Sequence, residues 1–168
     1  VAGGGTNTQA GIRAGAALLS SSTADQKNLI LLSDGLPTQS FQINDVTTKL
    51  EAFSETVQTE NGNTIGGFRT KTTMTESVYI YGTTVGYGSV PYTRIGISGN
   101  NYYSHSNSAI AQAAMFKNLG NDRTLWTIAL ETDADGDATL ASIASPGKDS
   151  TASTTDLEDI FDIIAGSI

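Results

Sequence analysis

The sequence contains no cysteine and only one histidine, His105. Without cysteine, neither a disulfide framework nor a zinc–thiolate site can form. A lone histidine among tyrosine and serine residues gives no basis for a catalytic triad, so we expect His105 to lie in a surface loop. The sequence also offers no activated nucleophile and no acid–base pair at a suitable spacing. We therefore expect the protein not to be an enzyme.

Basic residues and long apolar runs are scarce as well. Nine Lys and Arg residues stand against 17 Asp and Glu residues, which gives a net charge of −8. An acidic surface is repelled by nucleic acids and by anionic membranes, so neither is an expected partner. No apolar run is long enough to cross a bilayer, and we expect no membrane insertion. Residues 1–4 do not resemble a signal peptide, so a secreted form would be a processed piece or an excised domain.

The polar residues are mostly Ser, Thr, Asn and Gly, because only 15% of the 168 residues are charged. A chain of this length suits one domain with a substantial core. The lack of cysteine fits either a cytosolic protein or a surface protein of a Gram-positive bacterium. The abundance of Ser, Thr, Asn and Gly favours the second.

Two parts of the sequence, residues 1–35 and 106–168, alternate between helix and strand patterns. Residues 11–19 have the apolar spacing of a helix, and residues 29–32 form a continuous apolar run, typical of a strand buried on both faces of a parallel sheet. The later elements are a helix from Ser106 or Ser108 to about residue 118, a strand at 125–130 that places Trp126 in the core, a short helix at 138–144, and an amphipathic helix after a capping box at 155–158. This order predicts an α/β fold with an open, doubly wound, mostly parallel sheet.

Residues 36–105 have a different character, with short β-like runs at 56–59, 78–81 and 93–97. All six tyrosines of the chain lie in this segment: Tyr79, Tyr81, Tyr87, Tyr92, Tyr102 and Tyr103. We interpret it as an inserted β-rich arm, because a linker would not concentrate aromatic residues. The tyrosines are candidates for ligand contacts, since Tyr is enriched at interfaces. Alternatively they form the core of the arm, as the shared strand face of Tyr79 and Tyr81 suggests.

Two residues beside the regular elements have oxygen side chains suited to a metal ion. The stretch G-G-G-T-N-T at residues 3–8 puts Thr6 on a glycine-rich loop before a helix, and Asp34 follows the strand at 29–32. Ligands of open α/β sheets bind at the carboxyl ends of the strands. Taken singly, Thr6 or Thr8 would only cap a helix and Asp34 would be a turn residue. The presence of Thr6 and Asp34 with a helix and a strand between them favours a metal site.

This arrangement resembles the C-terminal two-thirds of a von Willebrand factor A domain. The shared features are the loop carrying Thr6, the strand that ends in Asp34, the W-T-I-A-L strand at residues 126–130, and I-A-S-P-G at 143–147 before the last helix. The resemblance covers residues 1–35 and about 106–168, with residues 36–105 as the inserted arm. It implies a metal-ion-dependent adhesion site in which Thr6 is a ligand and Asp34 contacts the ion, usually through water.

The main ligand loop of that family, D-x-S-x-S after the first strand, is absent from the sequence. The similar stretch D-S-T-A-S at residues 149–153 follows P-G-K and not an apolar strand, so we reject it as the ligand loop. A circular permutation would need an apolar strand in a place where the chain has none. The resemblance therefore implies that the first strands and the loop come from a missing N-terminal segment of the same domain or from another chain. Without them, one side of the sheet would be exposed.

The resemblance and the long insertion together suggest the A domain of a pilus tip or surface adhesin of a Gram-positive bacterium, outside the cell. A Mg²⁺ ion, with Mn²⁺ or Ca²⁺ as alternatives, would accept a carboxylate from a host extracellular protein. One alternative is a structural module for pilus or cell-wall assembly with a degenerate metal site. Another is a subunit of an intracellular metal-dependent ATPase such as a chelatase. The Tyr- and Thr-rich insertion and the absence of basic patches speak against the ATPase subunit.

A second acidic motif, D-A-D-G-D at residues 133–137, resembles the start of a calcium loop. Ala138 and Ala144 occupy the positions where an EF-hand needs Gly and Glu. We therefore expect a turn between a strand and a helix here, with Asp137 near the helix N-terminus.

Overall fold

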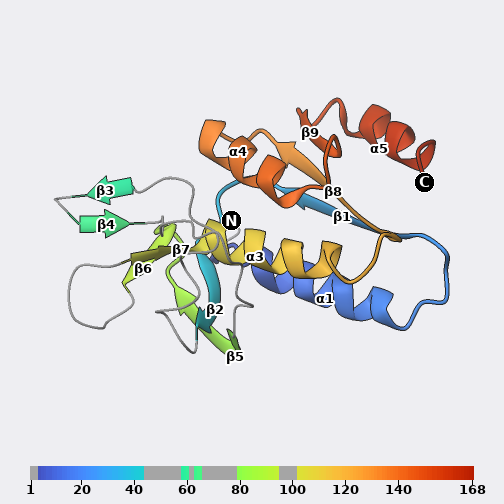
Figure 1. Cartoon of the computed structure of the whole chain (residues 1–168). Helices are drawn as coiled ribbons and strands as arrows, with labels where there is room; N and C mark the ends of the chain where they lie inside the picture. Colours follow the sequence, from blue (N-terminus) through green and yellow to red (C-terminus); the bar gives the residue numbers. More distant parts are fainter. Residues whose placement is uncertain (1–3, 44–57, 61–62, 66–78, 95–101) are drawn as a thin grey trace. The chain divides into compact units, whose positions relative to one another are not determined.

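The computed structural model describes residues 4–43, 58–60, 63–65, 79–94 and 102–168. The chain divides into two compact units: Val1–Ala10 with Pro37–Ala111, called the hairpin unit here, and Gly11–Leu36 with Gln112–Ile168, called the sheet unit. Two helices, α1 (Thr8–Ser20) and α3 (His105–Lys117), each have residues in both units (Figure 1). Each unit is described by itself. The division into residues 1–35 with 106–168 and an arm at 36–105 stays a prediction.

The sheet unit is built on three parallel strands. These are β1 (Lys27–Ser33), β8 (Arg123–Leu130) and β9 (Asp149–Ala152), in the order β1-β8-β9. Ile30 pairs with Trp126 and Leu32 with Ile128 in the register of β1 and β8. Helices connect and cover these strands, which confirms the α/β class and the parallel sheet predicted from the sequence.

One face of this sheet is covered by helices that precede and connect the strands. The side chain of Leu29 lies directly against Gly15 of α1, where a Cβ atom would collide with it. On the same face, the Thr127 hydroxyl donates to the Leu140 carbonyl of α4 (Ala134–Ile143) at 3.1 Å. Glycine at position 15 therefore allows α1 to pack closely on β1.

A half-buried lysine, Lys117, joins α3 to the end of α4. The Lys117 Nζ donates to the carbonyls of Ile143 and Ala144 at 2.9 and 2.8 Å. Carbonyls in the last turn of a helix lack partners within the helix and carry partial negative charge, so an ammonium group satisfies both needs. Burial lowers the pKa of Lys117 from its ordinary value.

The opposite face of the sheet is covered by α5 (Leu157–Ala165). The core cluster between α5 and the sheet consists of Trp126, Ile128, Ala152 and Ile164, with Leu130, Leu157 and Ile160 packed against it. Burying a side chain as large as that of Ile128 contributes about 1.5–3 kcal/mol to folding. The position of Trp126 confirms the prediction that it lies in the core.

The first strand does not have two covered faces. We expected residues 29–32 to be buried on both sides, but Ile30 is 38% exposed and Leu32 is 44% exposed. Both belong to the face that α5 covers over β8 and β9, because their register partners are Trp126 and Ile128. The reason is that β1 is an edge strand of the described sheet, and α5 packs on the other two strands.

Three local expectations in the sheet unit are corrected by the structure. Residues 149–152 form strand β9, which we did not predict because D-S-T-A is short and polar. Helix α4 begins at Ala134 and not at residue 138, since the Asp133 side chain accepts the Gly136 amide and caps the helix. The capping box at 155–158 is absent: the N-cap of α5 is Asp156, without a side-chain cap bond.

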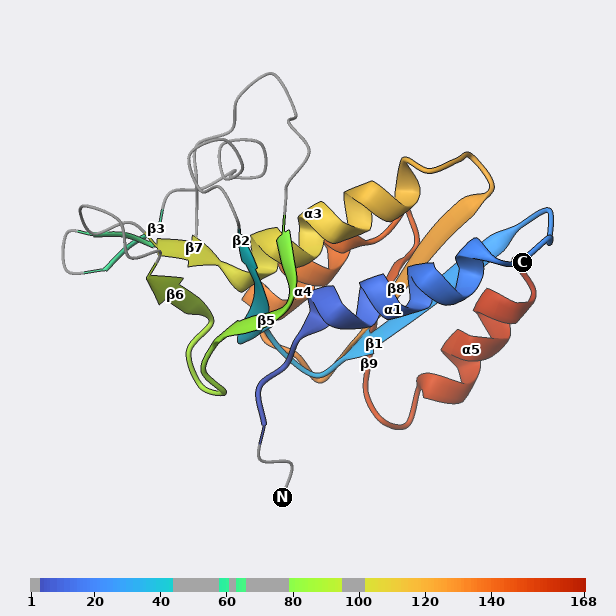
Figure 2. The ribbon, with the colours of Figure 1, turned by 90° about the horizontal axis from the view of Figure 1, so that it is seen from below.

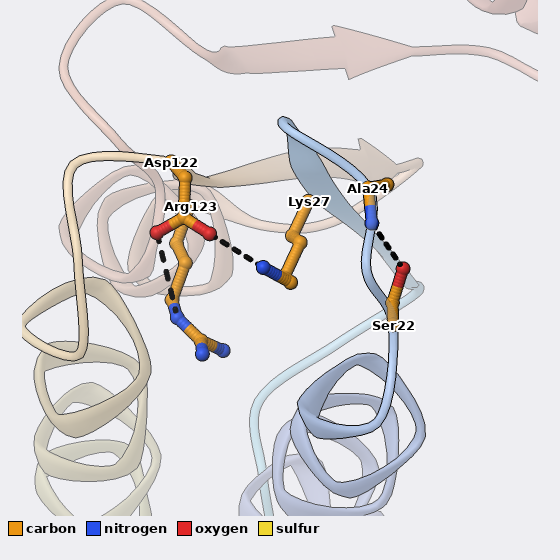
Figure 3. A network of polar contacts seen from close by, with 5 residues as sticks. All are labelled: Ser22, Ala24, Lys27, Asp122 and Arg123. Atoms are coloured by element: carbon orange, nitrogen blue, oxygen red, sulfur yellow. Dashed lines mark hydrogen bonds and ion pairs between the residues drawn. The ribbon is translucent and has the colours of Figure 1, made fainter.

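At the amino ends of β1 and β8, charged residues join the two strands (Figure 3). The Lys27 Nζ lies 2.7 Å from Asp122 Oδ2, and the Lys27 amide donates to the Asp122 carbonyl at 2.8 Å. The Arg123 Nε lies 3.9 Å from the other carboxylate oxygen, and its guanidinium lies 5.5 Å from the centre of the Phe116 ring. The pKa of Asp122 is lowered, mainly by its hydrogen bond from Lys27. These contacts connect the two strands at the end of the sheet opposite to its carboxyl edge.

The hairpin unit consists of short antiparallel pairs. Strand β2 (Gln39–Ile43) pairs with β5 (Tyr79–Gly86), with a bulge between Phe41 and Gln42 (Figure 2). The other pairs are β3 (Gln58–Glu60) with β4 (Asn63–Ile65) and β6 (Tyr92–Arg94) with β7 (Tyr102–Ser104). These strands agree with the predicted β-like runs where the two overlap. Residues 56, 57, 78 and 95–97 of those runs lie outside the described residues.

Within the residues that the structure describes, no helix combines the length and the apolar character needed to cross a membrane.

Candidate functional site

Asp34 lies immediately after the carboxyl end of β1 in the sheet unit, and it is exposed. The preceding residue, Ser33, is buried and its hydroxyl donates to the Gly35 carbonyl at 3.1 Å, which shapes the turn. Ser33 pairs with Ala129, so the carboxyl ends of β1 and β8 are neighbours. Asp34 therefore stands at the edge of the sheet where open α/β folds bind ligands, as the sequence predicted.

The residues after β8 form a helix start and not a calcium loop. Asp133 accepts the Gly136 amide at 2.8 Å, and the Thr132 hydroxyl donates to the Asp137 carboxylate. Carboxylates at a helix N-terminus are stabilised by the unpaired amides and the helix dipole. Asp137 lies near the helix N-terminus, as predicted, but residues 134–137 form the first turn of α4 and not a turn that precedes the helix. The contacts of Asp133 and Asp137 give these two residues a structural role.

Thr6 lies in the hairpin unit, on the loop before α1, and its backbone is held on both sides. Its amide donates to the Thr38 hydroxyl at 2.9 Å, and its carbonyl accepts the amides of Thr38 and Gln39 at 2.9 and 3.1 Å. The cap of α1 is Asn7, whose side chain accepts the Ala10 amide at 2.9 Å. Helix capping is thus done by a neighbour and not by Thr6 or Thr8.

Gly5, the residue before Thr6, lies close to the Gln39 side chain. A Cβ atom at Gly5 would lie 2.5–2.7 Å from side-chain atoms of Gln39, closer than real contacts allow. A larger residue in place of Gly5 would therefore require the Gln39 side chain to shift.

His105 is fully buried, so the prediction that it lies in a surface loop is wrong. It is the first residue of α3, and its Nδ1 lies 2.7 Å from the hydroxyl of Ser40, which is buried on β2. Burial lowers its pKa to about 4, because a charged imidazole is poorly solvated there. The polar sequence around His105 gave no sign of this burial, which comes from its pairing with a residue 65 positions away.

Gln9 is another buried polar residue that the sequence analysis missed. Its side-chain carbonyl accepts the Phe41 amide at 2.9 Å, close to the β2 bulge. A bulge frees backbone groups from the strand ladder, so a buried amide side chain can take over as acceptor. Gln9 of α1 and His105 of α3 thus each form a hydrogen bond with a residue of β2.

The tyrosines of the hairpin unit divide into packed and exposed side chains. Tyr79 is buried, and its ring centre lies 5.9 Å from that of Tyr81, which in turn meets Phe41 edge-on at 5.1 Å. Tyr87 is 71% exposed. Tyr79 and Tyr81 thus pack as strand neighbours, the second of the two readings given above. The side chains of Tyr92, Tyr102 and Tyr103 lie outside the described part of the structure.

Thr6 belongs to the hairpin unit and Asp34 to the sheet unit, and each is placed within its own unit. Among the residues described, no three His, Cys, Asp or Glu side chains are grouped so that they could hold a metal ion. The rejected stretch at 149–153 begins with the edge strand β9, and Asp149 pairs with Thr127 in the middle of β8. Four of its five residues therefore form strand β9, and only Ser153 follows the carboxyl end of that strand, which supports the rejection of this stretch as a ligand loop.

No protein-family model and no curated protein matches the chain. Solved structures do. The von Willebrand factor domain of the type V pili tip protein Mfa5 from Porphyromonas gingivalis has a TM-score of 0.70 and 22% identity, over 97% of this chain and 67% of that one. A structure of three N-terminal domains of Mfa5 has a TM-score of 0.59 and 24% identity, over 94% of this chain and 34% of that one.

The pilus adhesin SpaC from Lactobacillus rhamnosus GG, in an open conformation, is similar as well. Its TM-score is 0.59 and its identity 22%, over 95% of this chain and 19% of that one. The chain therefore spans about two-thirds of a single von Willebrand factor domain and a small part of a whole adhesin. At these identities the likeness concerns the fold, and the chain has the fold of von Willebrand factor domains.

Proposed function

We propose that the chain is part of an adhesion domain of a bacterial pilus or cell surface, which binds an extracellular host protein through a divalent metal ion. The observation that carries this proposal is the fold, shared with domains of a pilus tip protein and of a pilus adhesin. The exposed Asp34 at the carboxyl end of β1 supports it.

Thr6 and Asp34 fit a hard cation chemically. A hydroxyl and a carboxylate are the oxygen ligands that Mg²⁺ accepts, with Mn²⁺ or Ca²⁺ as alternatives. In this proposal the remaining ligands come from a segment outside residues 1–168, in keeping with the share of the Mfa5 domain that the chain spans. The anchored backbone of Thr6 would reduce the entropy lost when its hydroxyl binds an ion.

The ion would act as a bridge between two proteins. Hydroxyls and one or two carboxylates leave part of its positive charge uncompensated, so a carboxylate from a partner is attracted to an open position. No nucleophile or proton transfer is needed for this, in keeping with the expectation that the protein is not an enzyme. Tyr87 is our candidate for a direct ligand contact in the hairpin unit. Its side chain is exposed, whereas the rings of Tyr79 and Tyr81 pack against each other.

The test is calorimetric titration of Mg²⁺ and Mn²⁺ into the protein with its natural flanking segments. Each site variant has a matched control of the same substitution at an exposed loop position: Asp34→Asn with Asp25→Asn, and Thr6→Val with Thr23→Val. We expect saturable binding in the parent and both controls. Loss of the Asp34 charge in Asp34→Asn and of the Thr6 hydroxyl in Thr6→Val should each weaken affinity at least about tenfold.

The outcomes separate the proposed function from its main alternative. Equal affinity in Asp34→Asn and Asp25→Asn would show that Asp34 is not part of the site. Absence of any saturable binding in the parent would favour a structural module for pilus or cell-wall assembly with a degenerate metal site. Binding of a carboxylate-rich host protein that is abolished by EDTA would link the ion to adhesion.

A further inference from the structure

The chain contains two Asp-Gly pairs, Asp34–Gly35 and Asp135–Gly136. Such a pair is chemically labile, because the backbone nitrogen of the glycine can attack the side-chain carboxyl carbon of the aspartate and close a five-membered imide. Glycine favours this reaction, since it has no Cβ atom to hinder the attack and its backbone rotates freely. The reaction needs an unbonded glycine amide. The dipeptide is the same at both places, so the surrounding structure decides which pair reacts.

Asp34–Gly35 lies in the turn after β1, where both reacting groups are accessible. The Asp34 side chain is exposed, and a Cβ atom at Gly35 would meet no atom within 4 Å. The Ser33 hydroxyl donates to the Gly35 carbonyl at 3.1 Å, a bond that does not use the Gly35 amide. Within the described part of the chain, neither the Asp34 carboxylate nor the Gly35 amide has a hydrogen-bond or ion-pair partner.

Asp135–Gly136 also has an exposed carboxylate, but its glycine amide is bonded. Both residues lie in the first turn of α4, and Gly136 is buried. The Gly136 amide donates to Asp133 Oδ1 at 2.8 Å, and the next amide, that of Asp137, donates to the Asp133 carbonyl at 2.9 Å. Cyclisation at this pair would break the helix cap and distort the first turn. Asp135–Gly136 therefore serves as an internal comparison for Asp34–Gly35.

We propose that Asp34–Gly35 is a site of spontaneous isomerisation, where Asp34 becomes isoaspartate in the folded protein while Asp135 is preserved. In the first step the Gly35 nitrogen bonds to the Asp34 Cγ, and a carboxyl oxygen leaves as water with the amide hydrogen and a proton from solvent. In the second step water adds to the backbone carbonyl carbon of Asp34, the bond from this carbon to the Gly35 nitrogen breaks, and the nitrogen regains its hydrogen. The water lost in the first step is restored in the second.

The product has a longer backbone and a displaced carboxylate. The main chain of residue 34 then runs through its Cβ and Cγ atoms, which adds a methylene group at the carboxyl end of β1, and the carboxylate is attached directly to the Cα. In the proposed function Asp34 is a metal ligand, and this change would move its carboxylate away from the ion. That consequence rests on the proposed function, whereas the isomerisation itself does not.

Prolonged incubation of the protein, with its natural flanking segments, in neutral buffer tests the selection between the two pairs. Trypsin releases them on separate peptides, residues 28–49 and 124–148, and it releases the Asn61–Gly62 pair, which lies outside the described residues, on a third. Fragmentation by electron transfer in a mass spectrometer locates isoaspartate within each peptide. We expect it to accumulate at residue 34 and not at residue 135 in the folded protein, and at both residues at similar rates in guanidinium chloride.

Two results of this incubation would overturn the proposal. One is the absence of isoaspartate at residue 34 in the folded protein. The other is an equal rate at residues 34 and 135 in the folded protein, which would mean that the helix cap of α4 gives no protection.

Gly35→Ala tests the mechanism without altering Asp34. The added Cβ atom has open space, so the fold should persist with an unchanged Tm. Because this atom hinders the attack, isoaspartate at residue 34 should form at least about fivefold more slowly. Gly11→Ala is the matched control, since Gly11 lies on α1 and also has open space around it. Equal rates at residue 34 in the two variants would contradict the proposal.

A Mg²⁺ titration of the incubated protein separates this inference from the proposed function. If Asp34 is a ligand, the fraction of saturable Mg²⁺ sites should fall as isoaspartate at residue 34 accumulates, and Gly35→Ala should keep its sites for longer. Asp34→Asn cyclises faster than the parent, with loss of ammonia, so its own titration uses freshly prepared protein. Isoaspartate at residue 34 without any loss of sites would support the isomerisation and contradict the metal role of Asp34.

Discussion

The Nδ1 of His105 lies 2.7 Å from the Oγ of Ser40, and both side chains are completely buried. This pair joins the first turn of α3 to strand β2 inside the hairpin unit. Gly86 at the end of β5 completes the contact, because its Cα lies so close that an added Cβ would be 2.6 Å from the imidazole Nε2. Three segments far apart in the sequence thus meet at one histidine.

We predict that the hairpin unit loses stability in mild acid because of His105. Burial lowers its pKa to about 4 from the ordinary value of 6.5, so the folded state holds a neutral imidazole where the unfolded chain is protonated. The stabilisation is complete above pH 6.5 and is lost as the pH falls from 6.5 towards 4. The loss amounts to about 3 kcal/mol over this range.

Urea unfolding at pH 7.5 and pH 4.5 in the parent and in His105→Gln measures this effect. Glutamine cannot titrate but can still hydrogen bond with Ser40. The free energy of unfolding of His105→Gln should therefore fall by about 3 kcal/mol less than that of the parent between the two pH values. Carboxylates titrate in both proteins, and their contribution cancels in the difference. Identical pH dependence in the two proteins would rule out the proposed role of His105.

Gly86→Ala should be among the most damaging single substitutions in the hairpin unit. The backbone of Gly86 has φ +111°, and a Cβ there would strike the Thr38 carbonyl and the His105 ring. Gly82→Ala is the matched control, because Gly82 has φ +104° on the same strand but open space around it. Backbone strain costs about 1–3 kcal/mol in both variants.

The difference between the two glycine variants isolates the collision. We expect Gly86→Ala to lower the free energy of unfolding by at least about 2 kcal/mol more than Gly82→Ala, as overpacking typically does. Chemical denaturation followed by tyrosine fluorescence provides the measurement. Equal losses would mean that the surroundings of Gly86 can move aside.

In the sheet unit, Lys117→Met should destabilise the fold by about 1.5–3 kcal/mol. Its ammonium group supplies two charged hydrogen bonds to carbonyls at the end of α4, and methionine leaves both acceptors unpaired. Lys148→Met is the comparison, because the Lys148 Nζ only faces the Trp126 ring at 4.1 Å. That contact is worth about 0.5–1 kcal/mol. Thermal unfolding measures the loss in stability of both variants. A larger loss in Lys148→Met than in Lys117→Met would refute the prediction.

Thr38→Val should weaken divalent-ion binding if Thr6 is a ligand. The Thr38 hydroxyl accepts the Thr6 amide, and losing this bond loosens the loop without removing any ligand oxygen. Outer partners of metal ligands typically affect affinity about 10- to 100-fold. Thr84→Val, at an exposed position of β5, should leave affinity unchanged. A calorimetric titration with equal affinities for the two variants would contradict the role of Thr38.

The strands β1 and β8 were predictable from continuous apolar runs, and the helices α1 and α5 from the spacing of their apolar residues. The runs around Leu29 and Trp126 are short, apolar and flanked by polar residues, which is enough to predict strands. The strand β9 was not predictable, because residues 149–152 are polar and gain their conformation by pairing with β8. Asp133 shows the same limitation in a helix: the D-A-D-G-D motif suggested a turn, yet it begins α4 with a side-chain cap.

Buried polar groups were the main source of wrong predictions. His105 and Ser40 are 65 positions apart, and nothing in either local sequence indicates the other. The candidate metal residues were found differently, since Thr6 and Asp34 each follow from a short local pattern of glycine loop or strand end. A local pattern does not show whether other segments would supply further ligands, so the metal site is a proposal, whereas the fold is shown by similar structures.

The three hydrogen bonds between Thr6 and residues 38–39 have a mechanical consequence. Thr38 and Gln39 lead directly into β2, so tension applied to that strand reaches the Thr6 backbone before it reaches α1. The Thr6 loop cannot shift independently of the start of β2 unless these bonds break. A pull on the start of β2 is thereby passed to the Thr6 loop through hydrogen bonds, and not only along the intervening chain.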